Sequence, residues 1–126
     1  LGSITLNIKS YFYFKHFFEQ LPQNMHKNKR SKQPPQDPVN AVLSYWYSLY
    51  YNIITVKLLS NGYEPSIGYL HTAFTTHNAL SSDILEVFRS SINQAVINLF
   101  KKEILTKDDF SKKGGVYLKY DGRKKI

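Results

Sequence analysis

The sequence predicts a mainly helical fold with a short β segment near its C-terminus. Residues 39–61 and 79–105 are rich in apolar side chains and contain neither Gly nor Pro, as expected of long helices. At 100° per residue, one face of the second stretch collects apolar side chains: Ile84, Leu85, Phe88, Ile92, Ala95, Val96 and Leu99. The β segment is predicted at 116–120, directly after the chain-breaking pair Gly114-Gly115.

A first helix is predicted over residues 7–21, which are densely apolar and lack Gly and Pro. The Tyr-Phe-Tyr-Phe run at 11–14 would also suit a strand. Pro22 marks the end of this element, because proline cannot continue a helix. Aromatic residues at 11–18 more often form core than a platform on which bases stack.

Residues 22–36 are predicted to form a polar loop with four cations and no acid, and the cations are Lys27, Lys29, Arg30 and Lys32. Two interpretations stay open for the basic segment 27–32. It either holds DNA phosphates without reading sequence, or it is a solvated linker.

The central helix is predicted to begin after Asp37, because an acidic N-cap followed by Pro38 is a strong start signal. It runs to about Asn61 and is closed by Gly62, giving a length of roughly 36 Å. Because it is apolar on nearly every side, this helix is expected to be central and packed on several neighbours.

The third helix, 79–105, is expected to carry a polar face opposite its apolar one, formed by Asp83, Glu86, Ser90, Asn93 and Gln94. Val87 and Ile97 fall among these polar positions, so that face is not expected to be wholly hydrated. Thr106 and Asp109 then resemble a capping box that opens a short turn or helix.

Composition indicates a basic protein with a polyanionic partner. The net charge is +8 and the pI about 9.6. Nucleic acid is the commonest such partner, although an anionic membrane surface or simple solubility gives the same balance. The absence of cysteine excludes disulfides and thiolate–zinc sites and suits the cytoplasm.

The chain is predicted to be a single helical domain, 1–126, cut from a longer protein, because it starts at Leu1 and stops after a basic run. Charges within residues 1–21 argue against a signal peptide. Polar residues within 38–56 argue against a membrane span.

The candidate catalytic cluster is His71, Asp83 and Glu86. Carboxylate oxygens with one imidazole suit Mg²⁺ or Mn²⁺, and Asp83 and Glu86 lie three residues apart on one helix. The simpler interpretation is that both acids complement the helix dipole and that His71 is a loop residue. His16, His26 and His77 have no partner at ligand spacing and are predicted to be surface or loop residues.

Three motifs, in this order, resemble the CRISPR-associated integrase/endonuclease family. Asp37-Pro38-Val39-Asn40 resembles its Asp-Pro-x-Asn helix start. Pro65-Ser66-Ile67-Gly68-Tyr69-Leu70-His71 resembles its Pro-x-x-Gly-x-x-His segment, and Asp83 to Arg89 its Asp-x-x-Glu/Asp-x-x-Arg helix. The resemblance covers nearly the whole chain. It implies a multi-helix catalytic lobe that in the family follows a small β-rich N-terminal domain, which is absent here.

The resemblance also implies a site for one Mg²⁺ or Mn²⁺ ion, with His71 and Glu86 as ligands and Asp83 as a supporting acid. The family's third ligand is a Glu in a Glu-Gly-Asn-Ile-Arg segment before a Tyr-Tyr or Tyr-Phe pair. Here the segment reads Thr5-Leu6-Asn7-Ile8-Lys9-Ser10-Tyr11-Phe12, so Thr5 replaces that Glu. A neutral side chain there predicts weak metal binding and impaired catalysis.

The implied function is spacer acquisition, in which the 3′ ends of spacer DNA are joined to the CRISPR array. The DNA-backbone contacts expected are Lys9, Arg30, Lys32 and Arg89. The resemblance further implies a homodimer, a small ferredoxin-like CRISPR-associated partner subunit and no membrane. Two alternatives stay open: a non-catalytic DNA-binding or assembly subunit of the same fold, and an unrelated basic helical nucleic-acid-binding module.

Overall fold

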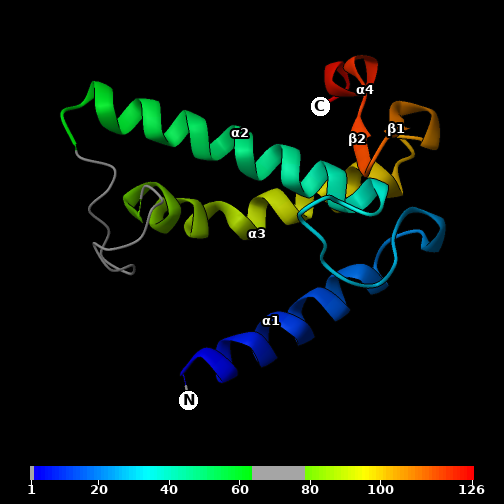
Figure 1. Cartoon of the computed structure of the whole chain (residues 1–126), viewed down its shortest axis with the longest axis horizontal. Helices are drawn as coiled ribbons and strands as arrows, with labels where there is room; N and C mark the ends of the chain where they lie inside the picture. The colour runs from blue at the N-terminus through cyan, green and yellow to red at the C-terminus, as the bar shows by residue number, and fades with distance from the viewer. Residues whose placement is uncertain (1, 64–78) are drawn as a thin grey trace. The chain divides into compact units, whose positions relative to one another are not determined.

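The computed structural model describes the backbone of residues 2–63 and 79–126, and the side chains of 11–63 and 80–126 (Figure 1). It confirms the mainly helical class with a small β element. Its elements in chain order are α1 (Gly2–Glu19), a 3-10 turn η1 (Gln23–Met25), α2 (Pro38–Ser60), α3 (Ala79–Lys101), a 3-10 turn η2 (Lys107–Asp109), β1 (Phe110–Lys112), β2 (Val116–Leu118) and α4 (Tyr120–Lys124).

The chain divides into two compact units. The first comprises Leu1–Ser44 and Asn93–Ile126, and the second Tyr45–Ile92, so both α2 and α3 pass from one unit into the other. The expectation of one domain over 1–126 stays a prediction. Within the described ranges, no helix combines the length and apolarity needed to cross a membrane.

Helix α1 begins at Gly2, five residues before the predicted start, and ends at Glu19. Only its last turn is core: Phe17 and Phe18 are 3% and 1% exposed. Other buried apolar side chains of the first unit include Val39, Val42, Leu43, Val96, Phe100 and Leu105. Tyr11, Phe12 and Tyr13 are exposed, so the prediction of an aromatic core holds for only part of 11–18.

Helix α2 ends as its sequence predicts. Gly62 has φ +80°, the amide of Tyr63 donates to the Leu58 carbonyl at 2.9 Å, and the Gly62 amide donates to the Leu59 carbonyl at 3.1 Å. This is a Schellman closure, and glycine adopts the left-handed conformation without a Cβ penalty. The expectation of a central helix packed on several neighbours holds only for the first part of α2. Residues 39–43 are buried, but apolar side chains of the second half are exposed, namely Leu49, Ile53, Val56 and Leu59.

In the second unit, α2 and α3 lie side by side (Figure 1). The hydroxyls of Thr55 and Ser81 are 2.7 Å apart, and Ser81 is fully buried. The guanidinium carbon of Arg89 lies 5.3 Å from the centre of the Tyr47 ring. Contacts of polar and charged side chains therefore join these two helices.

Helix α3 ends at Lys101, four residues earlier than predicted. Glu103 adopts a left-handed φ of +55°, and the Ile104 amide donates to the Leu99 carbonyl at 3.0 Å. The same closure as at Gly62 thus forms without glycine, so no glycine in the sequence marks the end of α3. The chain then turns back and buries Leu105 at 1% exposure.

The predicted apolar face of α3 is confirmed at four buried positions, Leu85, Ile92, Val96 and Leu99. Two residues of the predicted polar face of α3 are nevertheless buried, because Asp83 is 7% and Asn93 1% exposed. Conversely, Phe88 of the predicted apolar face is 45% exposed. The Asn93 side-chain amide donates to the Tyr13 hydroxyl at 2.6 Å, which ties α3 to α1 within the first unit.

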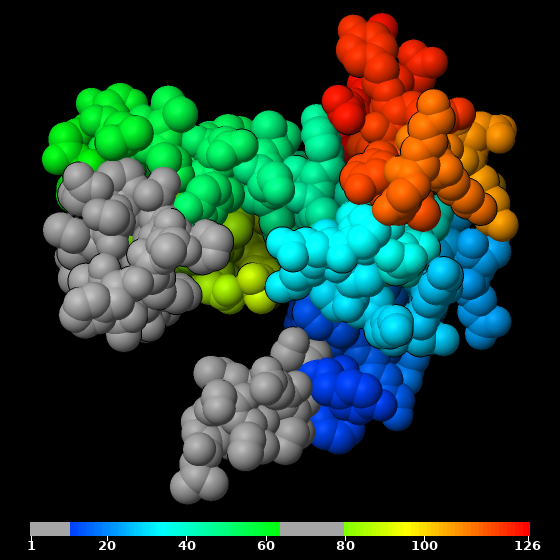
Figure 2. All heavy atoms as spheres, viewed as in Figure 1, coloured from blue at the N-terminus to red at the C-terminus, as the bar shows by residue number. Residues whose placement is uncertain are grey.

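The predicted β segment forms the second arm of a hairpin, in which Phe110 pairs with Leu118 and Lys112 with Val116. Helix α4 then follows the second strand. The Val116 amide donates to the Pro35 carbonyl at 2.8 Å, and the hairpin accordingly lies directly against the loop before α2 in Figure 2. A Cβ at Gly115 would lie 2.5 Å from Pro34 Cβ, so this close approach requires glycine.

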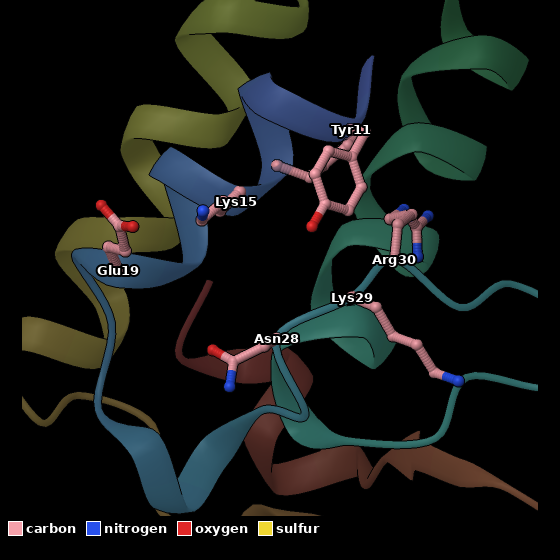
Figure 3. Close-up of a pocket in the computed structure, with 7 residues that line it drawn as sticks. Tyr11, Lys15, Glu19, Asn28, Lys29 and Arg30 are labelled. Atoms are coloured by element: carbon pink, nitrogen blue, oxygen red, sulfur yellow. The ribbon is translucent and has the colours of Figure 1, made fainter. Parts of the chain in front are cut away.

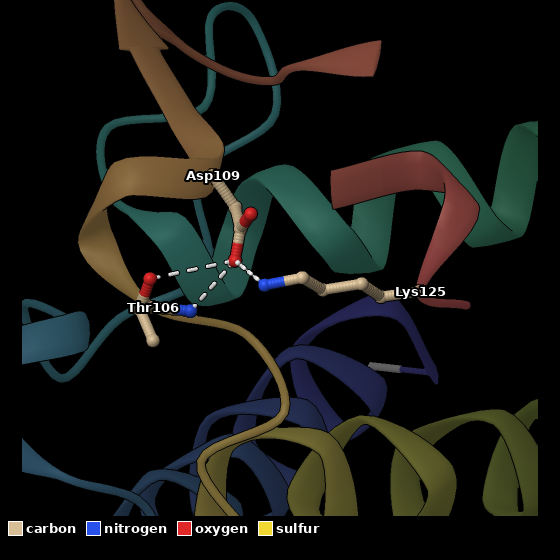
Figure 4. Close-up of polar contacts among 3 residues, drawn as sticks. All are labelled: Thr106, Asp109 and Lys125. Carbon is tan, nitrogen blue, oxygen red and sulfur yellow. Dashed lines mark hydrogen bonds and ion pairs between the residues drawn. The ribbon is translucent and has the colours of Figure 1, made fainter. Parts of the chain in front are cut away.

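The capping box predicted at Thr106 and Asp109 is confirmed, and it extends to a third residue (Figure 4). The carboxylate of Asp109 accepts from the Thr106 amide at 2.9 Å and from the Lys125 ammonium at 3.0 Å. Burial raises the pKa of Asp109, but the amide hydrogen bond and the Lys125 charge outweigh burial and leave its pKa below the usual value.

We expect wild type to exceed the Asp109→Asn variant in unfolding free energy by about 1–2 kcal/mol at neutral pH. Because the folded-state pKa lies below the unfolded value near 3.8, the carboxylate's contribution is complete above that value. It disappears as pH falls through the folded-state pKa. Urea unfolding at a series of pH values measures the difference in unfolding free energy between wild type and Asp109→Asn. A difference that does not change with pH would contradict the lowered pKa of Asp109.

Candidate functional site

The Asp-Pro-x-Asn motif fixes the loop that precedes α2. One carboxylate oxygen of Asp37 accepts from the Asn40 amide at 2.8 Å, which caps the helix. The other accepts from the Asn40 side chain at 2.8 Å and from the Lys27 amide at 3.2 Å. The motif therefore holds both the helix start and the basic segment 27–32.

Asn40 is fully buried, and its side chain uses all of its hydrogen-bonding capacity. Its Nδ2 donates to Asp37 and to the Lys29 carbonyl at 2.8 Å each, and its Oδ1 accepts from Arg30 at 2.8 Å and from the Ser31 amide at 2.9 Å. A buried amide with every position satisfied gives the basic segment one conformation.

Arg30, a predicted DNA contact, is half-buried and holds the loop together. Besides Asn40, its guanidinium donates to the Ser31 carbonyl at 2.6 Å and to the Ser44 hydroxyl at 3.1 Å. These bonds orient the cation in advance of any ligand. Lys27, Lys29 and Lys32 are exposed, as a solvated segment requires, although hydrogen bonds tie the segment to α2. Its contact with DNA stays a prediction.

His26 lies in the loop as expected, but it is buried rather than exposed. Its Nδ1 accepts from the Asn28 amide at 3.1 Å and its Nε2 lies 3.3 Å from the Leu21 carbonyl, a pattern that requires the proton on Nε2. The imidazole also lies 5.1 Å from the Phe18 ring. His26 thereby holds Asn28 at its left-handed φ of +60°.

A pocket of about 550 Å³ opens between α1 and this loop (Figure 3). Its lining carries three cations, one acid, one amide and two aromatic rings, and consists of Tyr11, Phe14, Lys15, Glu19, Asn28, Lys29 and Arg30. Figure 3 shows the Tyr11 ring projecting from α1 towards the loop, with Arg30 beside it. The lining therefore combines positive charge with an exposed aromatic surface.

Of the predicted metal cluster, the structure describes the two acids. Asp83 is buried on α3, and Glu86, one turn later, is exposed and pairs with Arg89 at 2.9 Å. His71 lies outside the described residues. Residues 2–63 and 79–126 contain no group of three His, Asp or Glu side chains suited to a metal ion, so the metal centre stays a prediction.

The structure describes only some of the remaining residues that were predicted to contact DNA or to stand at a metal-ligand position. Thr5 and Lys9 lie on α1, but their side chains are outside the described part. Lys32 is exposed, and Arg89 is partly exposed next to Glu86. Sequence reasoning missed Tyr11 and Lys15 as lining residues. The sequence carried no signal for them, because the exposure of Tyr11 within its aromatic stretch depends on packing.

Solved structures share this fold. A casposase bound to its integration product aligns over 92% of this chain and 34% of its own, with 27% identity and a TM-score of 0.81. A partial Cas6-RT-Cas1–Cas2 complex aligns over 89% of this chain and 36% of its own, with 31% identity and a TM-score of 0.79. The fold is thus shared with about a third of each of these two chains.

The family model of CRISPR associated protein Cas1 matches residues 9–126, and the chain belongs to this family. A CRISPR-associated endonuclease Cas1 from Clostridium perfringens is 37% identical over 94% of the chain. One from Thermodesulfovibrio yellowstonii is 39% identical over 93%. The chain spans 36% and 38% of the lengths of these two relatives. Membership excludes the unrelated basic module considered above.

Proposed function

We propose that the protein is a metal-dependent DNA integrase and endonuclease subunit of CRISPR spacer acquisition, which joins spacer DNA 3′ ends to the array. The family match over 9–126 carries this proposal. The likeness to a casposase bound to an integration product and the net charge of +8 support it.

The donors at the proposed centre fit Mg²⁺ or Mn²⁺. Glu86 offers a carboxylate on a side chain that is 47% exposed, and His71 would be the second ligand, with Asp83 in support. A bound divalent cation would neutralise charge on the scissile phosphate. Arg89, oriented by Glu86 and Tyr47, is suited to contact the DNA backbone beside that centre.

Thr5 provides the sharpest test of this centre. We expect the Thr5→Glu variant to bind Mn²⁺ at least about tenfold more tightly than wild type in calorimetry, because it adds a charged oxygen ligand. The Thr5→Gln variant, which matches the length of Glu without its charge, should bind like wild type. Equal Mn²⁺ affinity of wild type and Thr5→Glu would show that residue 5 is not a ligand position.

An assay of the joining reaction distinguishes two hypotheses: that the protein is a catalytic subunit, or that it is a non-catalytic DNA-binding or assembly subunit of the same fold. The presence of Thr5 in place of Glu favours the second hypothesis. Labelled spacer duplex, an array target and Mn²⁺ are incubated with wild type, Thr5→Glu and Thr5→Glu/Glu86→Gln, and joined DNA is resolved on denaturing gels. Joining by Thr5→Glu that Glu86→Gln abolishes supports the centre. DNA binding without joining by any variant supports the alternative.

The proposed partners are DNA, a second copy of the chain and a small ferredoxin-like CRISPR-associated subunit. Solved complexes that contain Cas1 and Cas2 support the last of these. Sedimentation of the chain alone and with that subunit measures both associations.

A further inference from the structure

We propose that the pocket between α1 and segment 27–32 binds one unstacked nucleotide of single-stranded DNA, with its base on the Tyr11 ring and its phosphate at Arg30, while Lys15 and Lys29 add positive charge around it. This inference rests on the proposed DNA-binding function. It adds a nucleotide site separate from the predicted metal cluster on α3.

The size and shape of the pocket suit such a ligand. Its volume of about 550 Å³ is in the range of small-molecule sites. It is lined from two sides, by α1 and by the loop (Figure 3). A pocket bounded in this way would accept one nucleotide taken out of its stack.

Tyr11 provides the stacking surface. Its side chain is 65% exposed although it belongs to an aromatic stretch that is buried further along α1. The Phe12 ring lies next to it in an edge-to-face arrangement, with 5.5 Å between centroids and an interplanar angle of 77°. Such a contact covers at most one face of the Tyr11 ring, and a free aromatic face stacks on bases of any sequence.

The charges of the pocket orient the nucleotide. Arg30 is held by Asn40, Ser31 and Ser44, so it meets a phosphate without first losing side-chain freedom. Lys15 and Lys29 add two further cations, while Glu19 at the end of α1 repels a phosphate. The phosphate is therefore placed at the end of the pocket formed by Arg30.

The test uses a fluorescent single-stranded oligonucleotide of about ten nucleotides, the same oligonucleotide with abasic positions, and a blunt duplex. In anisotropy titrations, Tyr11→Leu should weaken binding of the base-bearing oligonucleotide about fivefold or more and leave the abasic one unchanged. Tyr11→Phe, which keeps the ring, should bind like wild type. Lys15→Gln should weaken binding of both single strands and lower the salt slope by about 0.7.

Two matched controls remove the same chemistry outside the pocket. Tyr120→Leu deletes a tyrosine ring of similar exposure, 69%, on α4, and Lys113→Gln deletes an exposed charge on the hairpin turn. Neither should distinguish the base-bearing from the abasic strand. A Tyr11→Leu variant that binds both strands like wild type would overturn the inference while duplex binding leaves the proposed function intact. Loss of all DNA binding by the wild-type chain would overturn the proposed function itself.

Discussion

Replacing Asn40 by Ala should lower the free energy of unfolding by about 3 kcal/mol. The substitution leaves the Lys29 carbonyl, the Ser31 amide and the Arg30 guanidinium without their shared partner inside a buried network. An unsatisfied buried group costs its full desolvation penalty, so the loss exceeds the net value of the bonds themselves. Urea unfolding followed by circular dichroism measures the change.

Asn61→Ala is the matched control, because this residue also donates from its side chain, to the Lys57 carbonyl at 2.7 Å. Asn61 is exposed, so water replaces the lost bond, and we expect a change below about 0.5 kcal/mol. Similar losses for the two variants would refute the view that Asn40 organises the loop. Asn40→Ala should also reduce DNA affinity by loosening segment 27–32, which Asn61→Ala should not do.

Phe18→Ala should cost about 3–5 kcal/mol, the range for truncating a fully buried aromatic ring. Phe18 is 1% exposed, and its ring contacts Phe14, Phe17 and His26. Its removal leaves a cavity where α1 meets the loop, and it takes away the surface against which His26 packs. The midpoint and slope of urea unfolding report the loss.

Phe12→Ala makes the identical substitution on the same helix at a ring that is 60% exposed. We expect it to change stability by less than about 1 kcal/mol, because little apolar surface leaves the core. If Phe12→Ala proved as costly as Phe18→Ala, the assignment of only the last turn of α1 to the core would be wrong.

Local sequence signals predicted the elements whose causes are local. Asp37-Pro38 predicted the start of α2, Gly62 its end, and Thr106 with Asp109 the capping box. Each depends on hydrogen bonds or dihedral angles within a few residues, so the sequence contains the whole cause. The end of α3 was missed because Glu103 takes a left-handed conformation that glycine usually signals.

The candidate site was predictable only in its residue types. Sequence and resemblance together indicated a basic, DNA-contacting segment at 27–32 and acids at Asp83 and Glu86. They did not indicate that Arg30 is oriented by Asn40 or that Asp83 is buried, because both depend on residues that folding brings together. The convergence of His71 with Glu86 stays a prediction.

The sequence by itself determined the helical class, the helix caps and the basic character of the loop, because periodicity, capping and charge are properties of neighbouring residues. Only the tertiary structure decided that Tyr11 is exposed while Phe18 is buried, and that α1 and segment 27–32 form a pocket. Exposure and pockets depend on which surfaces meet, and surfaces meet through packing between residues distant in the chain.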